Sequence, residues 1–146
     1  MDEIKKPYKI TTFESGPMNN FIYVIEDIIT KKCALVDPAW DLTEIYNHIK
    51  QGGLSLERIL LTHSHHDHVN AIDNVLNDFD VPININRDEQ VFWMRTYDNF
   101  DLNYGGDLIY LGNTTIKSIH TPGHTPGSTC YHIGNDLIAG DTLFVF

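Results

Sequence analysis

Apolar and polar residues alternate near the start of the chain in a way that predicts strands. The stretch Tyr8–Phe13 alternates, and Gly16-Pro17 breaks the pattern. Two apolar stretches follow at 20–26 and 32–37, and Asp37-Pro38 ends the second of them. The chain is therefore expected to begin with one strand and then a pair of strands.

The spacing of apolar residues changes from that of strands to that of helices in the middle of the chain. Asp41-Leu42-Thr43-Glu44 is a capping-box pattern that opens an apolar helical face, and Gly52-Gly53 ends it. The spacing of apolar residues predicts the next helices and strands in the same way. The expected helices are at 41–51, 69–79 and 88–95, and the expected strands are at 58–61 and 81–85.

The remainder of the chain has the pattern of strands. Strands followed by two β–α units and then by more strands favour a layered α/β fold with mixed sheets. Parallel pairing is expected where helices intervene between strands. At 146 residues the chain fits one domain, which we expect to cover residues 1–146. The later strands are expected at 108–111, 115–119, 128–133 and 136–139.

A dense set of metal-ligand side chains follows the strand at 58–61. The sequence Thr62-His63-Ser64-His65-His66-Asp67-His68 has the pattern His-x-His-x-Asp-His. His63 and His65 are two residues apart in extended backbone, so both imidazoles point to the same side. Asp67 and His68 come where the chain turns into a helix, which suits a second direction and a second ion. Zinc accepts both histidine nitrogen and aspartate oxygen.

Two later segments carry further candidate ligands. His124 lies in Thr121-Pro122-Gly123-His124-Thr125-Pro126-Gly127-Ser128, where prolines and glycines predict a rigid loop between two strands. Asp141 follows a strand that is expected to be buried, where a carboxylate is costly unless it is paired or bound to a cation. Both segments are therefore expected to complete the metal site.

The other histidines and both cysteines are interpreted as structural. His48 lies on the helix at 41–51 and His132 lies in a strand, while His66 occupies the variable position of the motif. His120 is a candidate for supporting a ligand from behind. The two cysteines, Cys33 and Cys130, show no Cys-x-x-Cys pattern and are expected to be small core residues in a reducing, cytoplasmic setting.

The charge of the chain argues against nucleic acid as a partner. The formal net charge is −10, and such a surface repels phosphates. The N-terminal segment Met1–Pro7 has no apolar core of a signal peptide, and no segment approaches the apolar length of a membrane span. We therefore expect a small-molecule substrate, with no membrane partner.

These motifs together resemble the metallo-β-lactamase-fold hydrolases, most closely the glyoxalase II-like branch (hydroxyacylglutathione hydrolases). The match rests on Thr62–His68, on the Thr121–Ser128 loop and on Gly140-Asp141-Thr142-Leu143-Phe144, in the order that the family has them. The resemblance implies an αββα sandwich of two mixed β-sheets flanked by helices. It is weaker as a guide to the substrate, because this fold hosts many reactions.

The resemblance also implies a role for each residue. By this analogy the first metal is bound by His63, His65 and His124, the second by Asp67 and His68, and Asp141 bridges both. A metal-activated hydroxide would attack a thioester or related small acyl compound, and Asp67 would orient it. Two zinc ions are expected, although oxygen and nitrogen ligands leave iron and manganese open.

The sequence departs from the family after the Asp141 motif. The family has a further histidine for the second metal, whereas this chain has only five residues after Asp141 and ends at Phe146. We therefore expect that the C-terminal part of the second half is missing through truncation, or that a short form pairs as a homo-oligomer. Two alternative functions remain at this stage. One is a mononuclear iron persulfide dioxygenase using His63, His124 and Asp141, and the other is a truncated metal-binding domain with little or no activity.

Overall fold

The computed structural model describes residues 7–145 of the chain. The expectation about a signal peptide therefore rests mainly on residues outside the described range, as does the end of the chain at Phe146. Within the range, strands and helices follow in the order β1 (Tyr8–Ser15), β2 (Asn20–Asp27), β3 (Lys32–Val36), α1 (Thr43–Gln51), β4 (Ser55–Leu60), α2 (His66–Val69), α3 (Ile72–Asp78), β5 (Ile83–Asn86), α4 (Arg87–Trp93), β6 (Phe100–Asn103), β7 (Leu108–Leu111), β8 (Thr114–His120), β9 (Thr129–Ile133), β10 (Asp136–Ala139) and β11 (Thr142–Val145).

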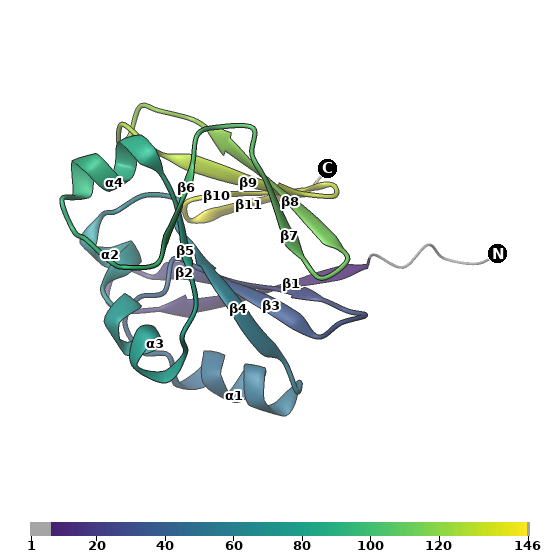
Figure 1. Cartoon of the computed structure of the whole chain (residues 1–146). Coiled ribbons are helices and arrows are strands. Elements are labelled where there is room, and N and C mark those ends of the chain that lie inside the picture. Colours follow the sequence, from purple (N-terminus) through teal and green to yellow (C-terminus); the bar gives the residue numbers. More distant parts are fainter. Residues whose placement is uncertain (1–6, 146) are drawn as a thin grey trace.

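The strands form two sheets that face one another (Figure 1). The first sheet has the order β1-β2-β3-β4-β5-β6. Its first three strands pair antiparallel, and β3 to β6 pair parallel. Parallel pairing across the intervening helices is thus confirmed. The second sheet has the order β11-β10-β9-β8-β7, and its described pairs are all antiparallel, so mixed pairing is confined to the first sheet.

Two apolar clusters hold the layers together. Along β2, Ile22 belongs to the cluster under the helices, whereas Tyr23 belongs to the cluster between the sheets. This alternation follows from the two-residue period of a strand whose two faces are both covered. Helix α1 contributes Ile45 and Ile49 to the first cluster, and α3 contributes Ile72 and Val75. Figure 1 shows α1 and α3 on the side of the first sheet that faces away from the second.

The middle of the chain departs from the expected single helix over 69–79. Helix α2 ends at Val69, and α3 begins at Ile72. The side chain of Asn70 accepts a hydrogen bond from the backbone N–H of Trp40 at 2.6 Å, so the interruption is tied to the loop after β3. Asp67 and His68 therefore lie in a short helical turn of their own, and His63 and His65 precede that turn.

Other differences concern the ends of elements. Helix α1 has Leu42 at its N-cap, and Asp41 accepts from the N–H of Thr43 at 3.0 Å instead of forming the expected capping box. Strand β4 begins at Ser55, three residues before the expected start. Strands β6 and β11 were not expected from the sequence. None of the described helices is long and apolar enough to cross a membrane.

Candidate metal centre

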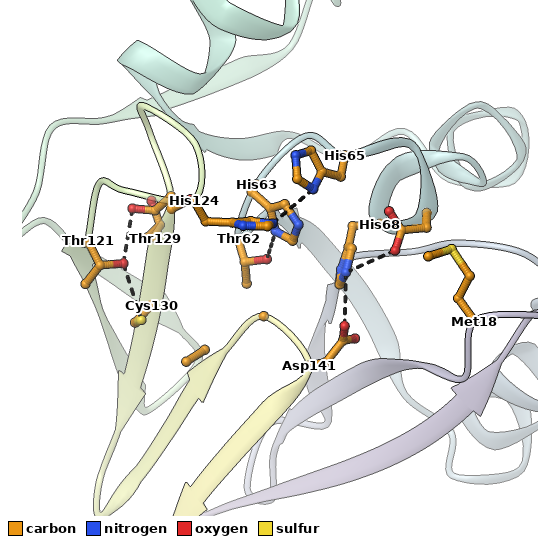
Figure 2. Close-up of a pocket in the computed structure, with 14 residues that line it drawn as sticks. Met18, Thr62, His63, His65, His68, Thr121, His124, Thr129, Cys130 and Asp141 are labelled. Atoms are coloured by element: carbon orange, nitrogen blue, oxygen red, sulfur yellow. Dashed lines mark hydrogen bonds and ion pairs between the residues drawn. The ribbon is translucent and has the colours of Figure 1, made fainter.

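All six predicted ligands line one cavity. Its volume is about 490 Å³, and it lies between the turn after β4, the β8–β9 loop and the β10–β11 turn (Figure 2). Strand order explains this convergence, because β3 and β4 are parallel and their carboxyl ends meet at one edge of the first sheet. The ligands in the wall are His63, His65, Asp67, His68, His124 and Asp141.

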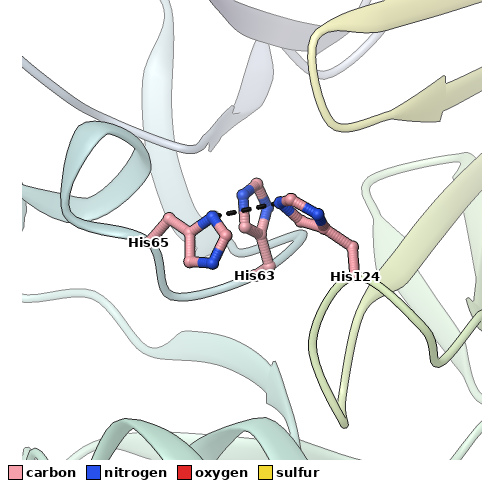
Figure 3. Close-up of side chains that lie close together, drawn as sticks. All are labelled: His63, His65 and His124. Carbon is pink, nitrogen blue, oxygen red and sulfur yellow. Dashed lines mark hydrogen bonds between the residues drawn. The ribbon is translucent and has the colours of Figure 1, made fainter.

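Three imidazoles form the tighter part of the site. Ligand nitrogens of His63, His65 and His124 all lie within 4.8 Å of one another. Nε2 of His124 is 3.0 Å from Nδ1 of His65, although the two residues are 59 positions apart in the chain (Figure 3). The β8–β9 loop therefore brings its histidine directly to the motif after β4.

The buried histidine of this group is held in one tautomer. The hydroxyl of Thr62 donates its proton to Oδ2 of Asp37 at 2.5 Å. The hydroxyl oxygen of Thr62 also lies 2.9 Å from Nδ1 of His63. Because its own proton is donated to Asp37, this oxygen accepts a hydrogen bond from that nitrogen. Nε2 of His63 then carries the free electron pair that a metal requires. Burial lowers the pKa of His63, which favours the neutral ring.

The second part of the site joins one imidazole to two carboxylates. Nε2 of His68 lies 3.3 Å from Oδ2 of Asp141 and 3.6 Å from Oδ2 of Asp67. Asn20, which is buried at the start of β2, donates from Nδ2 to Oδ2 of Asp67 at 2.8 Å. Its Oδ1 accepts from Nε1 of Trp40 at 3.2 Å, which fixes the amide orientation because an indole nitrogen only donates.

The surrounding charges control protonation in this second part. Burial opposes the charged form of His68, but the hydrogen bond and charge of Asp37 outweigh it. Together with Asp141 and Asp67 they raise the pKa of His68 to about 9. Burial also opposes the charge on Asp67, yet the hydrogen bond from Asn20 and the nearby His68 lower its pKa overall.

Asp37 belongs to the site, although the sequence pattern indicated only a strand end there. It is 1% exposed and accepts hydrogen bonds from the N–H of Thr62 at 2.8 Å and from Nδ1 of His68 at 3.0 Å. Asp37, His63 and His68 also form a group whose potential ligand atoms lie within 4.8 Å. Because the carboxylate oxygens are already used by these donors, we assign Asp37 to orienting the two histidines.

The loop that carries His124 is braced by its own hydrogen bonds, as its prolines and glycines predicted. The N–H of Thr125 donates to the Ser128 hydroxyl at 3.0 Å, and the N–H of Thr121 donates to the Ser128 carbonyl at 2.8 Å. Nε2 of His120 lies 2.9 Å from the carbonyl oxygen of Pro126 and donates to it. His120 thus supports this loop from behind.

Two expectations about local environment were wrong. As expected, Asp141 follows a strand, β10, but its side chain is 46% exposed because it lies in the turn between β10 and β11. Its Oδ1 accepts from the N–H of Phe21 at 3.0 Å, so the carboxylate is held without burial. Cys33 is buried as expected, whereas Cys130 is only partly buried and lines the cavity.

The donor set fits a divalent cation. Clustered imidazole nitrogens with at least one ring held neutral suit zinc and related ions, as do carboxylate oxygens nearby. The iron alternative expected His63, His124 and Asp141 to form one ligand set. Among residues 7–145, His63 and His124 instead group within 4.8 Å with His65, and no such group includes Asp141. The donor chemistry of the site thus favours a divalent cation.

Comparison with known proteins gives the same picture. Residues 15–146 match the Metallo-beta-lactamase superfamily. The chain is 34% identical to a probable polyketide biosynthesis zinc-dependent hydrolase, PksB, of Bacillus subtilis, over 95% of this chain and 61% of that protein. It is 33% identical to a hydroxyacylglutathione hydrolase of Pectobacterium atrosepticum, over 86% of this chain and 48% of that protein.

A solved structure shares the fold. The protein TTHA1623, crystallised in a di-iron-bound form, superposes with a TM-score of 0.74 at 23% identity, over 92% of this chain and 73% of that one. The chain spans less than two thirds of the length of PksB and of the hydroxyacylglutathione hydrolase. The family match covers most of the chain, and the two-sheet architecture agrees with it. The chain belongs to the metallo-β-lactamase superfamily.

Proposed function

We propose that this protein is a metal-dependent hydrolase that cleaves a thioester or a related small acyl compound. The observation that carries the proposal is the convergence of four imidazoles and two carboxylates on one cavity of about 490 Å³. That volume lies in the range typical of small-molecule sites. The names of the two relatives, a zinc-dependent hydrolase and a hydroxyacylglutathione hydrolase, support a hydrolytic reaction and zinc as the metal.

We assign the ligands in two groups. The imidazoles of His63, His65 and His124 would hold the first ion, as their mutual spacing supports. The second ion would be held by Asp67 and His68. Asp141 is assigned as the bridging ligand, and its 3.3 Å approach to His68 supports its place in the second group. When bound, such ions lower the pKa of water and polarise the carbonyl that is attacked.

The chain's own residues would prepare the site for this chemistry. Thr62 and Asp37 keep the coordinating nitrogen of His63 free of its proton. Asn20 holds one oxygen of Asp67. We assign the carboxylate of Asp67 to orienting the attacking water, which is the role of a group beside the reacting atoms in hydrolysis.

We extend the proposal to the setting of the protein. Residues 1–146 would act as one domain, with a small molecule as substrate and without nucleic acid or membrane as partner. A cytoplasmic location is supported by the free thiols of Cys33 and Cys130. Pairing of two chains into a homo-oligomer is part of the same proposal.

The test is hydrolysis of a panel of thioesters and lactones by the metal-loaded chain, with metal content measured on the same samples. The proposal predicts zinc-dependent thioester cleavage that is abolished in His63→Ala and in Asp141→Ala. His48→Ala is the matched control, because His48 lies on α1 beside Glu26 and does not line the cavity.

Each result has a separate meaning. Normal turnover and metal content in Asp141→Ala would disprove the bridging assignment. One iron per chain with oxygen consumption would replace hydrolysis by the dioxygenase alternative. Bound metal without turnover of any substrate in the panel would support the alternative of a metal-binding domain with little or no activity.

A further inference from the structure

A buried carboxylate lies beneath the two loops that carry the clustered imidazoles. Glu89 belongs to α4 and is only 1% exposed. Its Oε2 accepts hydrogen bonds from the backbone N–H of Ser64 at 2.7 Å and from the Ser64 hydroxyl at 2.6 Å. Its Oε1 accepts from the backbone N–H of Gly127 at 3.0 Å. One side chain thus links two segments that are far apart in sequence.

Both ends of this link lie next to metal ligands. Ser64 stands between His63 and His65, so fixing its backbone fixes the extended geometry that turns both rings to one side. Gly127 lies three residues after His124, in the loop between β8 and β9. The link therefore joins the two sources of the three-imidazole group, on the side that does not line the cavity.

The packing of Gly127 against α4 is a second, independent sign that this junction is built closely. A Cβ atom on Gly127 would lie 2.2 Å from the backbone nitrogen of Glu89 and 2.6 Å from its Cα. Only glycine allows this approach, which brings the backbone of the loop within hydrogen-bonding distance of the Glu89 carboxylate. Backbone contact and hydrogen bonds together set the position of the loop on the helix.

The energetics favour a rigid junction. A buried carboxylate is costly unless its oxygens are satisfied, and three donors satisfy this one. Two of the three are backbone N–H groups, which cannot rotate away as side chains can. Hydrogen bonds to a charged acceptor are stronger than those between neutral groups. Separating the two loops would therefore expose the Glu89 carboxylate to water or leave it buried without its hydrogen-bond donors.

We propose that Glu89 is a positioning residue, which holds the His124 loop against the His63–His65 segment so that the three imidazoles are arranged before a metal binds. This inference rests on the proposed function, since it assigns those imidazoles to a metal. Glu89 touches neither the ion nor the substrate and acts through Ser64 and Gly127. Its effect is on the affinity of the first metal position.

The test is zinc affinity, measured by competition with a chromophoric chelator on the 146-residue chain. Glu89→Gln keeps the size of the side chain but turns an NH₂ group toward an N–H donor, so one link of the junction is lost. Loss of a group that orients metal ligands typically costs 10–100-fold in affinity, and we expect a weakening in that range.

Glu44→Gln is the matched control. Glu44 is exposed, lies in the first turn of α1 away from the cavity, and its replacement makes the same chemical change. Its zinc affinity should stay close to that of the unmodified chain. Ser64→Ala is the second variant, which removes one of the three hydrogen bonds and leaves the carboxylate in place. It should weaken zinc binding in the same direction but less, and it keeps the proposal testable if Glu89→Gln does not fold.

Thermal unfolding of the metal-free variants separates positioning from simple stabilisation. If Glu89 served stability alone, Glu89→Gln would melt earlier without metal and bind zinc as tightly as the unmodified chain. That result would overturn the proposal, as would equal weakening in Glu44→Gln. Failure of the unmodified chain to bind zinc would instead overturn the proposed metal centre, and the role of Glu89 with it.

Discussion

Asp37 is hydrogen-bonded to both parts of the site, although its local sequence indicates only the end of a strand. Its carboxylate accepts from the backbone and hydroxyl of Thr62 and from Nδ1 of His68, all inside the protein. The contacts span 25 and 31 positions in the chain. A single group thus sets the orientation of His63, through Thr62, and of His68 directly.

Replacing Asp37 by asparagine should cost stability even without metal. The new NH₂ group must face either the N–H of Thr62 or the ring nitrogen of His68, so a buried donor loses its acceptor. Such a loss costs about 1–3 kcal/mol in the free energy of unfolding. Urea denaturation of Asp37→Asn measures it. Asp80→Asn, at an exposed position, is the control and should change the free energy by less than about 0.5 kcal/mol. Equal effects would disprove this account of Asp37.

The convergence of the six candidate ligands could be predicted from their motifs, and all six line one cavity. The residues that orient them could not. Asp37 reads as a strand end before proline, and Glu89 reads as part of a charged, solvated first turn of a helix. Asn20 gave no signal at all. Their partners in the ligand motif lie 25 to 47 positions away, and only the folded chain shows these contacts.

Among the elements, the β1–β2 turn is packed against the loop after β3. Gly16 has φ +80°, and a Cβ at this position would lie 2.3 Å from the ring of Trp40. The indole of Trp40 in turn donates to Asn20, which holds Asp67. The turn is therefore connected to the second part of the metal site through two side chains.

Gly16→Ala should destabilise the chain by more than backbone conformation alone explains. An alanine at positive φ costs about 1–2 kcal/mol, and the collision with Trp40 adds to it. Gly53→Ala is the matched control, because Gly53 has φ +61° with no atom within 4 Å of an added Cβ. Urea unfolding of the two variants should show a larger loss for Gly16→Ala. Equal losses would show that the Trp40 contact carries no energy.

The sequence predicted most elements but not all their limits. Strands with strong alternation and helices with an apolar stripe were placed correctly, because one face of each is buried. The break at Asn70 was not predicted, because it depends on a hydrogen bond to Trp40 thirty positions earlier. Strand β6 was missed, although Phe100–Asn103 alternates apolar and polar residues; its place in the sheet comes from parallel pairing with β5 in the folded chain.

At the scale of the whole molecule, Asp27 ties the two sheets together away from the metal site. It is fully buried at the end of β2, and its Oδ1 accepts from the hydroxyl of Thr114 in β8 at 2.6 Å. Its Oδ2 accepts from the N–H of Thr30 at 3.0 Å. Burial opposes the charge, but these hydrogen bonds outweigh it and lower the pKa of Asp27 from 3.8 to about 2.

This lowered pKa makes stability depend on pH in a defined window. The contribution of Asp27 is fully present above pH 3.8 and is lost as the pH falls toward about 2, because protonation then removes the charged acceptor. The free energy of unfolding should therefore differ between the unmodified chain and Asp27→Asn above this window, and the difference should shrink within it. Urea unfolding across the window measures this. The exposed control Asp98→Asn should show a small difference throughout. A difference for Asp27→Asn that does not change with pH would contradict the assignment.

The fold brings candidate ligands from three separate segments of the chain to one cavity, and the central claim is that this cavity binds a divalent metal through His63, His65 and His124. Calorimetric titration of the metal-free chain with zinc tests this most directly. The account predicts specific binding that is lost in His63→Ala and His124→Ala and retained in His48→Ala. Absence of binding by the unmodified chain, or equally tight binding by all three variants, would contradict it.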